Sequence, residues 1–307
     1  MPRELSFLPR EVRGALPARG IASGGQLSAA AAALRAPRWL AEVAGGLPRP
    51  VLRKLENAQL LLLWSVLLHD ALLDRPEQAR FTAWDAAALQ ARAQQLLASL
   101  FAPADPFWRG FARLLREQAA SARWEQRMRG KRPPFDAQLL RSLGSKAGLL
   151  RWPAFAVSRL SHGRGELGRE RALPGGRAAG PLDRLLQRLF IAHQLLDDLL
   201  DVDQDKASGQ PNAVLAAQGT LEKDPFERER QRAAARRLVC AAARGQLRAM
   251  ARALPAGSGL ARHCRRLLRS CDELDERTGQ TAALGATAHV LEALLAPSGS
   301  PARSTRR

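Results

Sequence analysis

The sequence LLQRLFIAHQLLDDLLDVDQD, residues 185–205, decides the fold and carries the strongest functional signal. Residues 185–192 form an apolar run that predicts a buried helix. Asp197, Asp198, Asp201, Asp203 and Asp205 follow within nine residues, in a chain whose net charge is +19. Asp197, Asp201 and Asp205 are spaced four apart, so like charges share one helix face at a cost of about 0.2–0.5 kcal/mol per pair. We expect a cation to occupy that face.

A second pair of carboxylates lies upstream. Residues 60–68 read LLLLWSVLL, and the same helical pattern continues to Asp70 and Asp74, again four residues apart. Two such helices facing each other direct carboxylates into one cavity from both sides. Sites made only of oxygen ligands suit Mg²⁺, which binds through a few carboxylates together with the phosphates of a substrate.

The composition favours helices throughout. Tyr is absent and Ile occurs only at Ile21 and Ile191, whereas Ala, Leu and Arg are abundant, so we expect an all-α protein. We predict an irregular segment over 1–25, one helical domain over 26–296 and a disordered basic tail over 297–307. The expected helices cover 26–44, 50–74, 83–101, 106–129, 135–160 (broken at Pro153), 181–206, 225–253, 258–278 and 282–296.

Charge, cysteine content and hydropathy indicate where the protein is located and which kinds of partner it has. Cys240, Cys264 and Cys271 form no close pair, which predicts free, buried thiols and a cytoplasmic protein. No apolar run reaches the length of a transmembrane helix, and the N-terminal residues lack the apolar core of a signal peptide. The positive charge comes mostly from Arg without a nucleic-acid-binding motif, so we interpret it as spread over helix faces and expect no nucleic-acid partner.

Taken together, the two acidic stretches resemble the aspartate-rich motifs of the trans-polyprenyl diphosphate synthases, a family of class I isoprenoid synthases. Asp-Asp-Leu-Leu-Asp at 197–201 resembles the second motif, and His-Asp-Ala-Leu-Leu-Asp at 69–74 resembles a degraded first motif. Lys-Ala-Gly-Leu-Leu at 146–150 resembles a lysine-containing segment that lies between them. The resemblance covers residues 45–215.

The resemblance implies a bundle of about ten helices around a central active-site cavity and, with it, a set of residue roles. Mg²⁺, expected as about three ions when substrate is bound, would be held by the carboxylates Asp70, Asp74, Asp197, Asp198 and Asp201. The diphosphate of a prenyl substrate would contact Lys146, Gln194 and Lys206. The small side chains of Ser65 and Val66 would leave room for the prenyl chain, although ordinary helix packing explains them equally well. A homodimer is also implied.

Several departures from the family pattern shape the functional expectation. Ala71 replaces one aspartate of the first motif, no Arg-Arg-Gly follows Asp74, and Gln210 stands where a Lys is usual. These losses fall on the half of the site that binds isopentenyl diphosphate. We therefore expect an Mg²⁺-dependent enzyme that ionises one allylic prenyl diphosphate, then cyclises it or transfers the prenyl group to another acceptor. Chain elongation and a non-catalytic partner subunit of a heteromeric prenyltransferase are the alternatives.

Overall fold

The computed structural model of the chain describes residues 24–74, 81–161, 180–219 and 225–295. Every regular element in those ranges is a helix, which confirms the all-α prediction. In chain order they are α2 (Gly24–Val43), α3 (Arg49–Asp74), α4 (Ala83–Ala98), α5 (Pro106–Met128), α6 (Ala137–Lys146), the 3₁₀ helix η3 (Leu149–Arg151), α7 (Trp152–Leu160), α8 (Pro181–Leu200), α9 (Val202–Ser208), α10 (Ala213–Gln218), α11 (Pro225–Ala253) and α12 (Gly259–Leu295).

The predicted terminal segments cannot be compared with the structure in full. Residues 24 and 25 begin α2, so the predicted irregular segment over 1–25 ends at least two residues too late. The remainder of that segment and the predicted tail over 297–307 lie outside the described residues.

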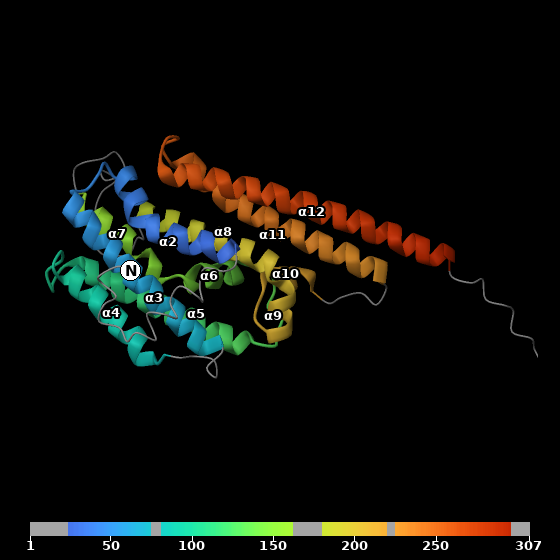
Figure 1. The fold of residues 1–307 in the computed structure, drawn as a ribbon, viewed down its shortest axis with the longest axis horizontal. Helices are drawn as coiled ribbons and strands as arrows, with labels where there is room; N and C mark the ends of the chain where they lie inside the picture. The colour runs from blue at the N-terminus through green and yellow to red at the C-terminus, as the bar shows by residue number, and fades with distance from the viewer. Residues whose placement is uncertain (1–23, 75–80, 162–179, 220–224, 296–307) are drawn as a thin grey trace, which may run out of the picture.

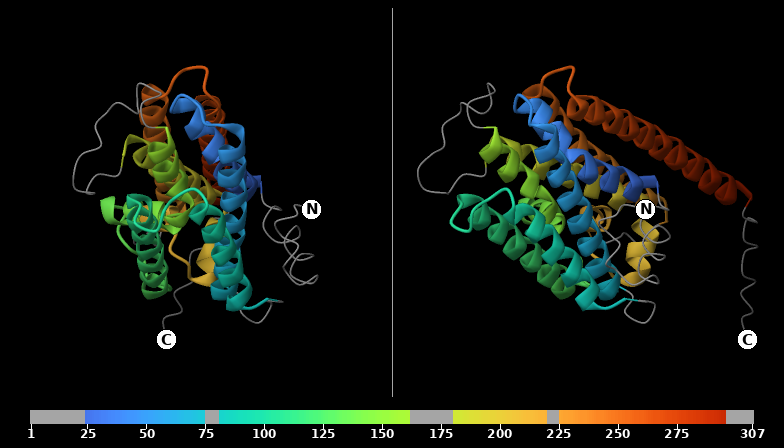
Figure 2. Two further views of the ribbon diagram at one scale, coloured as in Figure 1. Left: turned by 90° about the vertical axis from the view of Figure 1, so that its left-hand side faces the viewer. Right: turned by 60° about the vertical axis from the view of Figure 1, so that its left-hand side comes forward.

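The helix α8 is the centre of the bundle. It contacts α2, α6, α7 and α11, and Leu186, Leu189 and Leu195 on it are completely buried. Figures 1 and 2 show α11 and α12 side by side along one flank, while α3 and α4 form a pair on another. The apolar run that opened the sequence analysis is therefore the helix around which the others pack.

A glycine allows α6 to approach α8 closely. A Cβ atom at Gly144 would lie 2.7 Å from Cγ1 of Ile191, a distance that real Cβ contacts do not reach. Because Lys146 ends α6 two residues later, this close approach brings its ammonium group near the acidic end of α8.

Three predicted helix boundaries were wrong. The single helix expected over 181–206 is two helices that meet at Asp201, and the stretch 135–160 breaks at residues 147–148 before it reaches Pro153. Pro153 instead lies in the first turn of α7, where its missing N–H costs nothing. The helices expected over 258–278 and 282–296 are one helix, α12, which continues through Gly279.

A buried ion network connects α5, η3 and α8. The guanidinium of Arg151 donates from Nε to Oδ1 of Asp183 (2.8 Å) and from Nη2 to Oδ2 (2.9 Å), and the two side chains are 2% and 1% exposed. Asp183 also accepts from Nη2 of Arg113 (2.9 Å), and Arg151 donates from Nη1 to Glu117 (3.2 Å). This network fixes η3 against both helices.

A buried histidine pair joins α8 to α12. Nε2 of His193 and Nε2 of His263 are 3.1 Å apart. Since Arg266 lies within hydrogen-bonding distance of Nδ1 of His263 (3.4 Å), His263 carries its proton on Nε2 and donates it to His193. Burial lowers the pKa of His193 to about 3, with a further contribution from His263. Both rings are therefore neutral near pH 7.

The predicted state of the cysteines is confirmed. Cys240, Cys264 and Cys271 are free and buried, and burial raises the pKa of all three thiols. None of the helices in the described ranges has the length and apolarity needed to cross a bilayer.

Candidate functional site

One pocket of about 910 Å³ collects most of the residues that the sequence singled out. Side chains from α3, α5, α6, η3, α8 and α9 line it. Its acidic members, which define the acidic pocket, are Asp70, Glu125, Asp197, Asp198, Asp201 and Asp205. Its volume falls within the range of about 300–1,000 Å³ that is typical of small-molecule sites.

The structure brings both aspartate-rich stretches to this pocket. Asp70 enters from α3, and Asp197 and Asp201 enter from the end of α8. Lys146, Gln194 and Val66 also line it. Asp74 is the last residue of α3, and its side chain lies outside the described part of the chain.

Two of the predicted residues are not brought to the pocket. The hydroxyl of Ser65 is buried and donates to the carbonyl of Ala86 (2.9 Å), so it lies between α3 and α4 and does not line the pocket. Lys206 is exposed on α9 and is not among the lining residues either. Ser65 is therefore part of ordinary packing between α3 and α4. Lys206 lies apart from the residues that face the pocket.

The carboxylate of Asp198 is engaged within the chain. It is 1% exposed, and its two oxygens accept from Nε2 of Gln194 and from the backbone N–H of Ala213, both at 2.7 Å. Asn212 donates to the backbone carbonyl of Asp198 and to the carboxylate of Asp205, each at 2.8 Å. Asp198 thus connects α8 to α10, while burial raises its pKa to about 6 against the opposing influence of Lys146 and Gln194.

Asp197 differs sharply from its neighbour in sequence. Its carboxylate makes no hydrogen bond to any residue that the structure describes, and it faces the acidic pocket. Burial, together with the charges of Asp198 and Asp201, raises the pKa of Asp197 to about 7. A cation in the pocket would relieve this repulsion, so Asp197 is the carboxylate best placed to gain from one.

The positive charge of Lys146 acts on Asp197 and Asp198. Nζ of Lys146 lies 2.6 Å from Oε1 of Glu125 on α5. Burial alone would lower the pKa of Lys146, but Glu125, Asp198 and Asp205 together raise it above its ordinary value. The ammonium group therefore stays charged at the wall of the pocket.

Sequence reasoning missed the contribution of α5. Gln118, Glu125, Gln126 and Arg129 line the pocket from this helix and the residue that follows it. Glu125 and Arg129 are spaced four apart in a stretch rich in charged residues, a pattern that is equally typical of a solvated helix face. Only the packing of α5 against α6 and η3 distinguishes the two.

Apart from its charged residues, His69 and six glutamines, the wall of the pocket is apolar. It is formed mostly by aliphatic and aromatic side chains of α3, α5, η3 and α8, which include Leu63, Val66, Leu67, Leu115, Leu149, Leu150 and Phe190. The pocket therefore combines acidic side chains, Lys146 and Arg129 with an apolar surface, an arrangement that fits an amphiphilic ligand with a polar head.

The fit of this donor set to Mg²⁺ depends on what else supplies ligands. Among the side chains described, no three His, Cys, Asp or Glu residues are grouped to hold a metal ion by themselves. Mg²⁺ is usually bound by one or two carboxylates plus substrate phosphates. Asp70, Asp197 and Asp201 are oxygen donors of the right kind for such a shared site. The residues therefore fit Mg²⁺ that is bound jointly with a phosphorylated ligand.

Comparison of the chain with protein-family models, curated proteins and solved structures gave no match.

Proposed function

We propose that this protein is an Mg²⁺-dependent class I isoprenoid synthase that ionises an allylic prenyl diphosphate in the acidic pocket. The observation that supports the proposal is that carboxylates from α3 and α8, a charged lysine and an apolar wall line the same cavity. A prenyl diphosphate has the matching shape, with a trianionic head and a hydrocarbon tail.

The polar head would lie among Asp70, Asp197 and Asp201. Mg²⁺ bound there would act as a Lewis acid on the diphosphate oxygens as the carbon–oxygen bond breaks. Lys146 and Arg129 would add positive charge where negative charge develops on the leaving group. Gln194 would act indirectly, because its amide donates to Asp198 and holds the end of α8 in place.

The apolar wall would hold the hydrocarbon chain and the carbocation left after ionisation. Val66, Leu67, Leu149 and Phe190 line this part of the pocket and offer no nucleophile. Excluding water from this region would prevent premature capture of the cation. The π face of Phe190 is a suitable neighbour for positive charge.

The charges of the pocket favour one diphosphate over two. Among the described lining residues, only Lys146 and Arg129 carry a permanent positive charge, and Lys146 is already paired with Glu125. A chain-elongating enzyme must hold a second diphosphate, that of isopentenyl diphosphate, beside the first. We therefore propose cyclisation or transfer to another acceptor in preference to elongation.

The test is incubation of the protein with Mg²⁺ and geranyl, farnesyl or geranylgeranyl diphosphate, each with and without isopentenyl diphosphate, with products identified by mass spectrometry. A hydrocarbon, alcohol or prenylated acceptor formed without isopentenyl diphosphate is the expected result. A longer prenyl diphosphate formed only in its presence would instead establish elongation. The absence of turnover and of binding would favour a non-catalytic partner subunit.

A further inference from the structure

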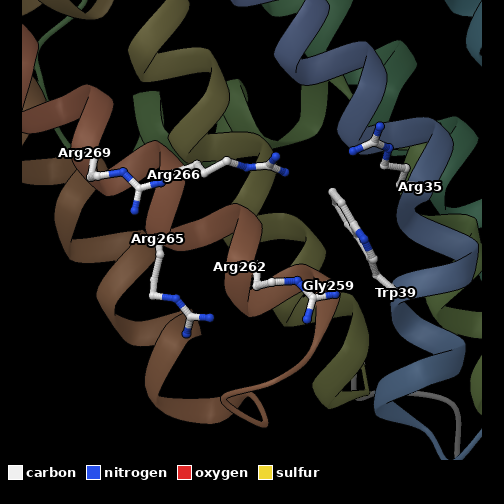
Figure 3. Close-up of a pocket in the computed structure, with 7 residues that line it drawn as sticks. All are labelled: Arg35, Trp39, Gly259, Arg262, Arg265, Arg266 and Arg269. Carbon is white, nitrogen blue, oxygen red and sulfur yellow. The ribbon is translucent and has the colours of Figure 1, made fainter.

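A second hollow, of about 500 Å³, lies between α2 and the start of α12 and is lined almost entirely by arginines. Figure 3 shows Arg35 on α2 and Arg266 on α12 extending their guanidinium groups toward each other across it, with Trp39 at one side. We call this hollow the arginine groove, and its lining residues are Arg35, Trp39, Gly259, Arg262, Arg265, Arg266 and Arg269. It shares no lining residue with the acidic pocket.

Helical spacing brings the arginines together. Arg262, Arg265, Arg266 and Arg269 follow the pattern i, i+3, i+4, i+7, which places them on one face of α12. A glycine allows that face to approach α2, because a Cβ at Gly259 would lie 2.5 Å from the Trp39 ring. The N–H of Gly259 donates to Glu42 (3.0 Å), so this backbone donor at the start of the helix is already used within the chain.

The positive charge in the groove is not neutralised by the described part of the chain. None of its five arginines forms an ion pair with a described carboxylate, and all five are exposed. Further along the same helix, by contrast, Asp272 and Asp275 pair with Arg244. Gathering unpaired guanidinium groups in one concave site is unfavourable unless an anion compensates them.

Neutral groups hold three of these arginines in position. Arg262 donates to the carbonyl of Gly257, and Arg265 donates to the carbonyl of Ala256 (3.0 Å). Arg266 lies 3.4 Å from Nδ1 of His263. Such contacts orient a guanidinium without removing its charge, which reduces the entropy lost when an anion binds.

The positive charge of the groove also acts on the buried side chain of His263. Burial is the main cause that lowers the pKa of His263 to about 4, and the charges of Arg266 and Arg35 lower it further. Trp39 packs against the His263 ring with a centroid separation of 4.9 Å. The His263 ring that packs against Trp39 is thus neutral near pH 7, and the positive charge of the groove comes from its five exposed arginines.

We propose that the arginine groove binds a compact anion that carries two or more phosphate groups. Guanidinium groups bind phosphate oxygens through paired hydrogen bonds, and the convergence of five around a small hollow favours a compact ligand over an extended one. The basic face of α12 ends at Asp272, whose side chain is 61% exposed, so it does not offer the long continuous track that a nucleic-acid backbone requires.

Calorimetry with tripolyphosphate in EDTA tests this site directly, because EDTA silences Mg²⁺-dependent binding at the acidic pocket. We expect binding by the wild-type chain and a loss of affinity of about 10- to 100-fold in Arg262→Gln/Arg266→Gln. Arg35→Gln/Arg269→Gln should lose a similar amount, and these two arginines make no hydrogen bond to the described residues that folding could depend on. Arg237→Gln/Arg248→Gln, which removes the same charge from exposed positions outside the groove, should bind like the wild type.

Two further arms distinguish the sources of the phosphate. Vesicles that contain a phosphoinositide bisphosphate would identify a lipid headgroup if they bind the wild-type chain and not the groove variants, whereas binding of tripolyphosphate alone would identify a free anion. Equal affinity in all variants would overturn the proposal. So would binding of duplex DNA without binding of tripolyphosphate or vesicles, because the charge would then be a nucleic-acid surface.

Discussion

Replacement of Asp183 by Asn should strongly lower the free energy of unfolding, although Asp183 does not line the acidic pocket. Asp183 is 1% exposed and accepts two hydrogen bonds from Arg151, which is 2% exposed. Asn has almost the same shape, but it carries no charge and turns an N–H group toward the guanidinium. The substitution therefore leaves a buried positive charge whose remaining acidic partner is Glu117, at 3.2 Å.

The expected cost follows from the burial of the pair. Removing one partner of a buried ion pair costs about 3–5 kcal/mol of unfolding free energy. At about 2–4 °C per kcal/mol for a domain of this size, the melting temperature should fall by about 6–20 °C. The matched control is Asp272→Asn, which breaks the exposed pair with Arg244 and should cost about 0–1 kcal/mol.

Urea unfolding followed by circular dichroism measures both variants, and a third variant separates charge from packing. Arg151→Met with Asp183→Leu removes both charges and should recover most of the lost stability, because two apolar side chains need no partner. If Asp183→Asn loses no more unfolding free energy than Asp272→Asn, the buried pair does not contribute the stability proposed for it. A double variant that is no more stable than Asp183→Asn would likewise refute this explanation.

Three further predictions concern the pocket and the histidine pair. Lys146→Met should lower turnover of a prenyl diphosphate by about 10²–10³-fold, whereas Lys206→Met, on an exposed side chain outside the pocket, should leave kcat near the wild-type value. Calorimetry should detect no Mg²⁺ binding by the protein alone but clear binding when a non-ionisable thio analogue of farnesyl diphosphate is present; tight binding of Mg²⁺ alone would contradict the shared site. Because His193 and His263 have folded pKa values of about 3 and 4, below the unfolded value of about 6.5, the unfolded chain binds protons first as the pH falls. Lowering the pH from 7 to 5 should therefore remove about 2–4 kcal/mol more stability from the wild type than from His193→Gln/His263→Gln, and urea unfolding at both pH values checks this.

Local sequence patterns predicted most of the helices because the apolar runs and the residues that end helices lie within single segments. The break of the Asp-rich helix at Asp201 was not predictable in that way. The carbonyl of Asp198 accepts from the side chain of Asn212, fourteen residues later, so a contact between separate segments replaces a bond within the helix. Asn212 also caps the missed helix α10, by accepting from Val214 and Leu215.

The residues of the candidate site also fall into two groups, those that the sequence could predict and those that it could not. Asp70, Asp197 and Lys146 could be chosen because each belongs to a recognisable spacing, and all three line the pocket. Glu125 and Arg129 could not, since charges at this spacing are common on exposed helices. Likewise, the sequence gives no sign that Asp198 uses both of its oxygens within the chain, because its partner Ala213 lies beyond the motif.

Measurement of diphosphate release would test whether Asp197 helps to ionise a prenyl diphosphate. The rate should be measured with geranyl, farnesyl and geranylgeranyl diphosphate for the wild type, for Asp197→Asn and for Asp203→Asn. Asp203 is an exposed aspartate of the same acidic stretch that does not line the pocket. We expect Mg²⁺-dependent release of diphosphate by the wild type and by Asp203→Asn. EDTA and Asp197→Asn should each abolish it. Release that is unchanged in Asp197→Asn, or no release from any of the three substrates, would contradict this role of Asp197.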